Sequence, residues 1–264
     1  MPPIIVGNVN KRIWIPLVVL LGAVVGLLIF PRPDSPRASY HGKSLRAWLL
    51  QLVRNSSPPH QDPVAVLEAE RAINQIGTNA FPILLAWAAM RDPPFNVTMK
   101  ALLGDSLALK LNVWSAEDYH AFAGWGFHLL NASAKPVVPE LILLLKDPDP
   151  SIRAGAVYCL AKIGPNAEEA ISPLIQSLVD PDVHNDSLSA LRLIGVAPDV
   201  MVSNLMGFLS LNNSGQKGWA ILRLGAFGTN AQVAIPSLER LLPDPNPYIS
   251  GAASNALEKI DAGR

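Results

Sequence analysis

Ile163-Gly164-Pro165-Asn166-Ala167 is the stretch that decides the fold, because the chain carries close copies of it. Ile76-Gly77-Thr78-Asn79-Ala80 is an earlier copy, and Gly228-Thr229-Asn230-Ala231 begins 64 residues after Gly164, with Ile194-Gly195 in between. A fixed spacing of about 32 residues is typical of one supersecondary unit that is copied along a chain. The repeated phrase therefore predicts a stack of helical hairpins, which usually forms a surface that holds another molecule.

The composition allows a large core and does not suggest a broad basic surface. Half of the 264 residues are hydrophobic, and 21 Lys and Arg residues balance 21 Asp and Glu residues. Proteins that bind nucleic acid usually carry a basic stripe, so we expect no nucleic-acid partner. Cys159 is the single cysteine, which excludes an intrachain disulfide.

The N-terminal segment predicts a membrane anchor. Residues 13–30 are apolar and uncharged, and as a helix they would span about 27 Å, close to the bilayer core of about 30 Å. Lys11 and Arg12 precede this run and favour a cytoplasmic N-terminus. We therefore expect a tail over residues 1–12, one transmembrane helix over 13–30 and a soluble domain outside the cytoplasm. A cleaved signal peptide is the alternative, although its apolar region would span only about 7–15 residues.

A Pro-rich linker is expected over residues 31–43, and a helical array over residues 44–264. In each unit, an Asp before a Pro ends the first helix. A second Asp can accept hydrogen bonds from the free amides at the start of the second helix. A glycine then ends the second helix. A short capping helix with Leu45, Trp48 and Leu49 on its apolar face comes first. After it, the pattern predicts helices over residues 64–76, 82–89, 99–111, 119–130, 138–146, 152–163, 171–179, 185–194, 200–209, 217–224, 235–242 and 249–260.

Residues 135–167, KPVVPELILLLKDPDPSIRAGAVYCLAKIGPNA, resemble a HEAT repeat in the Pro of the first helix, the Asp-Pro-Asp turn and the Ala-rich second helix. The chain is similar in particular to bacterial HEAT-repeat proteins, which often carry an N-terminal anchor and an opening like Tyr40-x-Gly42-Lys43-x-Leu45-x-x-Trp48. The resemblance implies an all-α fold, a right-handed α-solenoid of about five to six HEAT-like hairpins. The family arginine stands only at Arg153, so a continuous Asp–Arg ladder is not expected.

No residue pattern in the chain predicts chemistry. The five histidines have no Glu or Cys partner at metal-ligand spacing, and no Gly-x-Ser-x-Gly nucleophile pattern occurs. Gly42-Lys43-Ser44 matches the end of a phosphate-binding loop, but Arg37 stands where that loop needs its first glycine. We therefore expect no catalytic activity, no cofactor, no metal site and no small-molecule substrate.

Two functions remain open for such an array. The first is a membrane-tethered scaffold that binds a protein partner on its concave face. The second, on fold analogy alone, is a HEAT-like lyase of the phycobilin-lyase type or an enzyme accessory subunit. Buried carboxylates and a histidine in one pocket would favour the enzyme, and a continuous open concave face would favour the scaffold.

One set of aromatic and basic residues shares a register in the second helices. Counted back from the closing glycine or its equivalent, the packed positions are 1, 4, 5 and 8, so position 6 lies about 150° away, on the inner curve of a HEAT array. Tyr158 with Lys162, and Trp219 with Arg223, form aromatic–basic pairs there, which suit peptides or acidic groups. The alternative is that the rings only pack over neighbouring side chains. The candidate partner-binding residues are Trp125, Tyr158, Lys162, Arg192, Trp219 and Arg223.

Overall fold

The computed structural model describes residues 36–56, 61–92 and 114–261, together with the single positions 98, 101, 102 and 104. The predicted tail over residues 1–12 and the predicted membrane anchor over 13–30 lie outside the described residues, as does most of the helix expected over 99–111. Within the described part of the chain, no helix combines the length and the apolar character that crossing a membrane requires.

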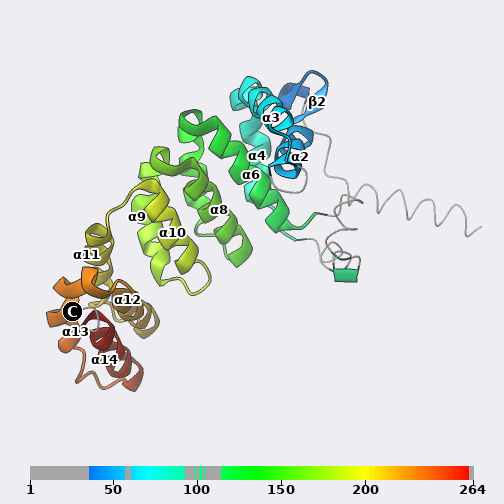
Figure 1. Ribbon diagram of the computed structural model, residues 1–264. Coiled ribbons are helices and arrows are strands. Elements are labelled where there is room, and N and C mark those ends of the chain that lie inside the picture. Colours follow the sequence, from blue (N-terminus) through cyan, green and yellow to red (C-terminus); the bar gives the residue numbers. More distant parts are fainter. Residues whose placement is uncertain are drawn as a thin grey trace, which may run out of the picture.

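The described residues form six helical hairpins stacked into an elongated array (Figure 1). Within it, α8 packs against both α6 and α10, and α12 packs against α14. The fold is thus an all-α repeat protein of stacked hairpins that resemble HEAT repeats, as predicted. The first helices of the hairpins are α2 (Leu45–Asn55), α4 (Phe81–Ala88), α7 (Val138–Leu144), α9 (Ile171–Gln176), α11 (Pro198–Phe208) and α13 (Ile235–Glu239). The second helices are α3 (Pro63–Ile76), α6 (Ala116–Leu130), α8 (Pro150–Ile163), α10 (His184–Ile194), α12 (Ser214–Ala226) and α14 (Pro247–Asp261).

Capping residues explain where the second helices begin and end. The Asp149 side chain accepts a hydrogen bond from the Ser151 amide at 3.0 Å, and Pro150 occupies the first position of α8. Gly77 and Gly164 follow the last residues of α3 and α8 with φ of 57° and 64°. L-residues other than glycine rarely adopt that conformation, so the glycine of the repeated phrase stops the helix, as predicted.

Short 3-10 helices replace parts of the expected α-helices and connect the hairpins. Several first helices are therefore shorter than predicted; α7, for example, ends at Leu144 rather than at residue 146. The 3-10 helices are η1 (Pro36–Ala38), η2 (Gly77–Ala80), η3 (Asn131–Val137), η4 (Gly164–Ala170), η5 (Ser177–Val179) and η6 (Gly228–Ala234).

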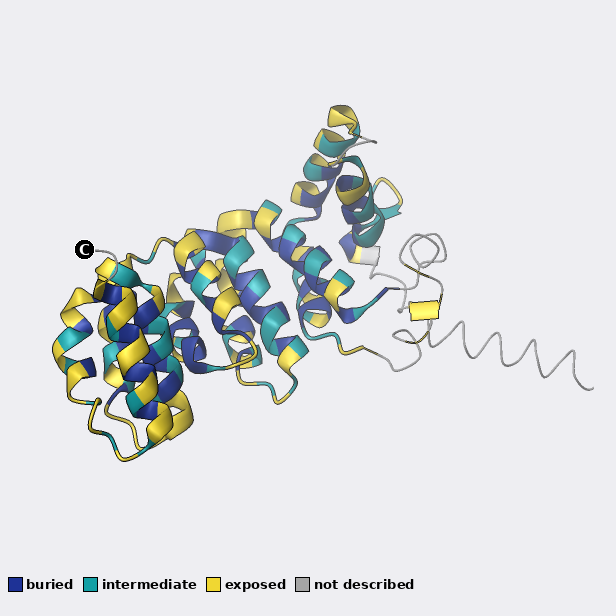
Figure 2. Ribbon diagram, turned by 60° about the horizontal axis from the view of Figure 1, so that its bottom comes forward, coloured by how far each residue is buried: buried dark blue, intermediate teal, exposed yellow. Residues whose placement is uncertain are grey.

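The core is a continuous cluster of buried side chains, mostly aliphatic or small and with aromatic rings such as Phe122 and Phe127 in α6. Figure 2 shows the buried positions along the helices. Leu160 and Ile163 of α8 are 0% and 2% exposed, which confirms the predicted phase of that helix. Cys159 is also fully buried, and this burial raises the pKa of its thiol. The thiol therefore stays protonated and belongs to the packed face, as expected from its position.

The described end of the expected linker is structured. Residues Ser39–Tyr40 (β1) and Lys43–Ser44 (β2) pair as an antiparallel hairpin, and His41 and Gly42 between them have φ of 48° and 72°. Two central residues with positive φ are typical of the tight turns that join such strands. The indole of Trp48 donates a hydrogen bond to the Tyr40 carbonyl at 3.2 Å, so the hairpin is attached to α2. Strands of two residues carry no hydrophobic periodicity, and the sequence therefore did not predict them.

A ladder of ion pairs links the turns of neighbouring hairpins. Arg153 reaches Asp180 and Asp182 of the next turn at 2.8 and 2.7 Å, and it also donates to the carbonyl oxygen of Asp147 at 3.0 Å. Arg91 makes the equivalent link for the preceding hairpin, at 3.0 Å from the Asp147 carboxylate. The ladder is therefore longer than expected from Arg153 alone, because a loop arginine outside the helical register supplies one link.

The ladder is interrupted between α10 and α12. Lys217 lies 4.0 Å from Asp244 and links α12 to the last turn, but the described residues contain no ion pair that joins α10 to α12. Here His184 stands at the position that Arg153 has in α8, and its Nδ1 lies 3.1 Å from the Asp180 carbonyl of its own turn. Its ring packs against that of Trp219 instead, with centroids 4.9 Å apart and the ring planes tilted by 34°.

Candidate binding groove

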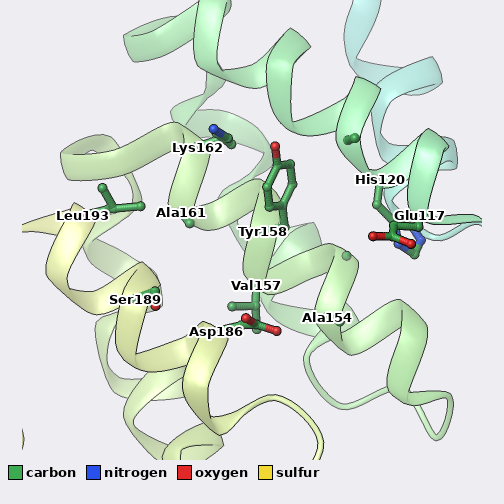
Figure 3. A pocket seen from close by; sticks show the side chains of 12 residues that line it. Glu117, His120, Ala154, Val157, Tyr158, Ala161, Lys162, Asp186, Ser189 and Leu193 are labelled. Atoms are coloured by element: carbon green, nitrogen blue, oxygen red, sulfur yellow. The ribbon is translucent and has the colours of Figure 1, made fainter.

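An open groove of about 510 Å³ runs along α8, with α6 and α10 as its walls (Figure 3). All three are second helices, which share one face of the array, so the groove lies on the side where the sequence placed the candidate residues. Tyr158 and Lys162 are among the side chains that line it. The lining residues are Glu117, His120 and Ala121 from α6, Ala154, Gly155, Val157, Tyr158, Ala161 and Lys162 from α8, and Asp186, Ser189 and Leu193 from α10.

Tyr158 rests its ring on the backbone of the neighbouring helix. A Cβ atom added to Gly124 of α6 would overlap that ring, so the close approach depends on glycine. The ring is half-buried, and this burial raises the pKa of the phenol above its ordinary value. Tyr158 therefore presents a protonated hydroxyl, which has no hydrogen-bond partner among the described residues.

Lys162 lies beside two aromatic rings. Its Nζ is 4.4 Å from the ring centroid of Trp125 and 5.2 Å from that of Tyr158. His128 supports this arrangement, because its Nδ1 lies 3.2 Å from the Lys162 carbonyl and its ring meets Trp125 edge-on at 5.8 Å. Cation–π contacts of this kind contribute about 0.5–1 kcal/mol each at exposed sites. No carboxylate of the described residues pairs with Lys162, so the ammonium is held in place with its charge unpaired.

His120 is buried in the wall of the groove and packs rather than reacts. Its Nε2 lies 3.0 Å from the Met90 carbonyl, and a Cβ on Gly155 would lie 2.8 Å from its ring. Burial lowers the pKa of His120, which keeps the imidazole neutral with Nε2 as the donor. Within the described part of the chain, no group of three or more His, Cys, Asp and Glu residues could hold a metal ion.

Two carboxylates that the sequence analysis missed lie at the other end of the groove. Glu117 is in the first turn of α6 and Asp186 is in the first turn of α10, and both are exposed. Ser189 lies six residues before Gly195, as Tyr158 lies six before Gly164, and Asp186 lies one helical turn before Ser189. The position of Asp186 could therefore have been predicted. Glu117 could not, because its place depends on how α6 is offset along α8.

The six candidate residues do not form one continuous set. Trp125, Tyr158 and Lys162 come together at the groove, but Trp219 and Arg223 meet elsewhere, between α10 and α12. The Arg223 guanidinium carbon lies 5.7 Å from the Trp219 ring centroid, and Nη1 donates to Asn185 at 2.9 Å. Burial lowers the pKa of Arg223. Arg192 is exposed in the last turn of α10 and does not line the groove.

Trp219 packs against His184 and therefore fits the packing interpretation that the sequence left open. Tyr158 and Lys162 are different, because they line the groove, with Trp125 beside Lys162. Among the described residues, the two aromatic–basic pairs therefore lie in different surroundings and do not form a repeating ladder.

Comparison with a family model supports the assignment of part of the repeats. No curated protein matches the chain. Crystal structures of three engineered proteins are similar to it. The first is 20% identical, with a TM-score of 0.30, and the match covers 81% of this chain and 97% of that one. The second is 20% identical over 81% and 58% of the two chains, with a TM-score of 0.29. The third is 17% identical over 83% and 99%, with a TM-score of 0.29. Residues 123–195 match the family model of HEAT repeats, and this stretch includes most of the residues that line the groove.

Proposed function

We propose that the protein is a HEAT-repeat interaction module that holds a protein partner in the groove along α8 and has no catalytic activity of its own. The observation that supports this most directly is the open groove in which Tyr158 and Lys162 stand beside Trp125. Aromatic residues are enriched in protein interfaces, and those that anchor a partner carry much of the binding energy. Positioned rings also lose little conformational entropy when a partner binds.

The same groove argues against the lyase alternative. An enzyme of that type would be favoured by buried carboxylates beside a histidine, whereas Glu117 and Asp186 are both exposed. The one histidine in the wall, His120, is engaged by the Met90 carbonyl and is kept neutral by burial. These groups suit the recognition of a ligand better than proton transfer.

Truncation of Tyr158 is expected to weaken the capture of the partner. A photoreactive benzoylphenylalanine at Ala161, which lines the groove, should crosslink the full-length chain to its partner in cells, and the same probe at Glu140 on α7 should not. Tyr158→Ala should lower the affinity by about 2 kcal/mol, roughly 30-fold, if the ring anchors the partner.

Trp219→Ala is the matched control, because it also removes a half-buried ring but lies outside the groove. Thermal melting of both variants separates lost contacts from lost folding. Equal loss of capture in the two variants, or capture that Tyr158→Ala does not change, would contradict the assignment of the groove.

We further propose that the array is tethered to a membrane by residues 13–30 and lies outside the cytoplasm. The support is the uncharged apolar run and the basic residues before it. After sodium carbonate extraction, the full-length chain is expected in the membrane pellet with the intact mass of all 264 residues. A chain shortened by removal of the apolar run would indicate the signal-peptide alternative. Full-length chain in the carbonate supernatant would reject the tether.

A further inference from the structure

The charged side chains that line the groove are not neutralised by the protein itself. Glu117, Asp186 and Lys162 have no hydrogen-bond or ion-pair partner through their side chains among the described residues. The charged side chains at the turns between helices differ from those in the groove, because Arg153 is paired with both Asp180 and Asp182. Charged side chains in the turns of the chain thus form ion pairs with one another, whereas the three that line the groove do not. Oppositely charged groups of a ligand can therefore pair with these three side chains.

These charges are separated along the groove by sign. His120 packs on Gly155, which sets the offset between α6 and α8 and places Glu117, one turn before His120, near the N-terminal end of α8. Asp186 lines the opposite wall from the first turn of α10 (Figure 3). Lys162 lies in the last turn of α8. The groove is therefore acidic at one end and basic at the other.

The distance between the acidic and the basic end of the groove determines how far apart the two charged side chains of a ligand must lie. Ala154 and Lys162 are eight residues apart on α8, which corresponds to about 12 Å along the helix axis at about 1.5 Å per residue. An extended chain covers that distance in about four residues, at about 3.3 Å each. Between the ends, the groove offers apolar contacts from Tyr158, Ala161 and Leu193, of which Leu193 is 59% exposed.

We infer that the groove takes an extended segment of the partner protein that carries a basic side chain and, three to five residues away, an acidic side chain, with apolar residues between them. The basic side chain lies between Glu117 and Asp186, and the acidic one meets Lys162 and the Tyr158 hydroxyl. This inference rests on the proposed function and specifies the chemistry of its partner.

The test is a selection of random 12-residue peptides, displayed on phage, against the full-length chain in detergent micelles. Enriched peptides are expected to contain Lys or Arg three to five residues from Asp or Glu. Lys162→Glu should remove the preference for the acidic residue, and Glu117→Lys with Asp186→Lys should remove the preference for the basic one. A selected synthetic peptide should bind the Lys162→Glu variant about tenfold more weakly, and this difference should shrink as salt is raised.

Two kinds of variant control for folding and for nonspecific charge effects. Lys162→Met keeps an apolar side chain of similar length beside Trp125 and removes the charge. It should therefore lose the acidic preference, with only the small fall in melting temperature that the lost cation–π contacts account for. Glu140→Lys on α7 and Lys259→Glu on α14 are exposed charge reversals outside the groove and should change nothing.

The outcomes separate this inference from the proposed function. Enriched peptides without a paired basic and acidic residue, or with a preference that the charge reversals do not move, would overturn the inference. If those peptides still compete with the crosslink from Ala161, the proposed function stands. A crosslink from Ala161 to a second copy of the chain, or to its own N-terminal residues, would also overturn the inference. Absence of both enrichment and crosslink would reject the two together.

Discussion

Leu160→Ala is expected to lower the free energy of unfolding by about 2–5 kcal/mol, because the side chain is fully buried in the middle of the array. The substitution removes the contacts of several methyl and methylene groups and leaves a cavity between helices that cannot close over it. Urea denaturation of the variant and the parent chain, followed by far-ultraviolet circular dichroism, measures the difference.

Lys162→Ala is the control for Leu160→Ala, two residues away on the other face of α8. Lys162 is not in the core, but it contacts the rings of Trp125 and Tyr158, so the substitution should cost about 1–2 kcal/mol at most. Because hairpins of a repeat array mainly contact their neighbours, faster amide exchange in the Leu160→Ala variant should be strongest in α6 to α10 and weaker in α14. Equal costs for the two substitutions would mean that the faces of α8 are assigned wrongly.

Arg153→Ala is expected to cost about 2–3 kcal/mol of stability, more than a surface ion pair would. The Arg153 side chain is 13% exposed, and one guanidinium group joins Asp180, Asp182 and the carbonyl of Asp147. Its removal leaves two carboxylates and a carbonyl oxygen without their donor, and it releases the turn of one hairpin from the next. Arg153→Lys should recover only some of the loss, because a single ammonium cannot reproduce the fork of the guanidinium.

The same denaturation experiment with Arg192→Ala provides the reference for Arg153. Arg192 is exposed and outside the ladder, so its truncation should change stability by no more than about 0.5 kcal/mol. A similar small effect for Arg153→Ala would show that the ladder contributes little to holding neighbouring hairpins together. A large effect that is insensitive to salt would agree with the partly buried geometry of the pair with Asp180.

Much of the fold could be predicted because it depends on local rules. The period of the repeated phrase predicts the hairpins, and the phrase itself carries the glycine that ends a second helix, as Gly77 and Gly164 do with positive φ. The 3.6-residue periodicity predicts which face of a helix is packed, and Leu160 and Ile163 are accordingly buried. Asp149 before α8 could be predicted as a cap, because a short carboxylate there meets amides that have no other partner.

The site, in contrast, depends on how neighbouring second helices are offset, and periodicity within one helix contains no information about that offset. Side-chain size decides it: Gly124 admits the ring of Tyr158, and Gly155 admits that of His120, so α6 and α8 approach closely. Trp219 does not share the register of Tyr158, because α12 ends at Ala226 and Trp219 lies nine residues before Gly228, as Gly155 does before Gly164. Its ring therefore packs against His184, as Gly155 does against His120. The sequence by itself therefore determined a stack of HEAT-like hairpins and the faces of its helices. Only the tertiary structure decided that Lys162 lies beside Trp125 and Tyr158 in a groove with Glu117 and Asp186, because contacts between helices, not positions along them, bring these side chains together.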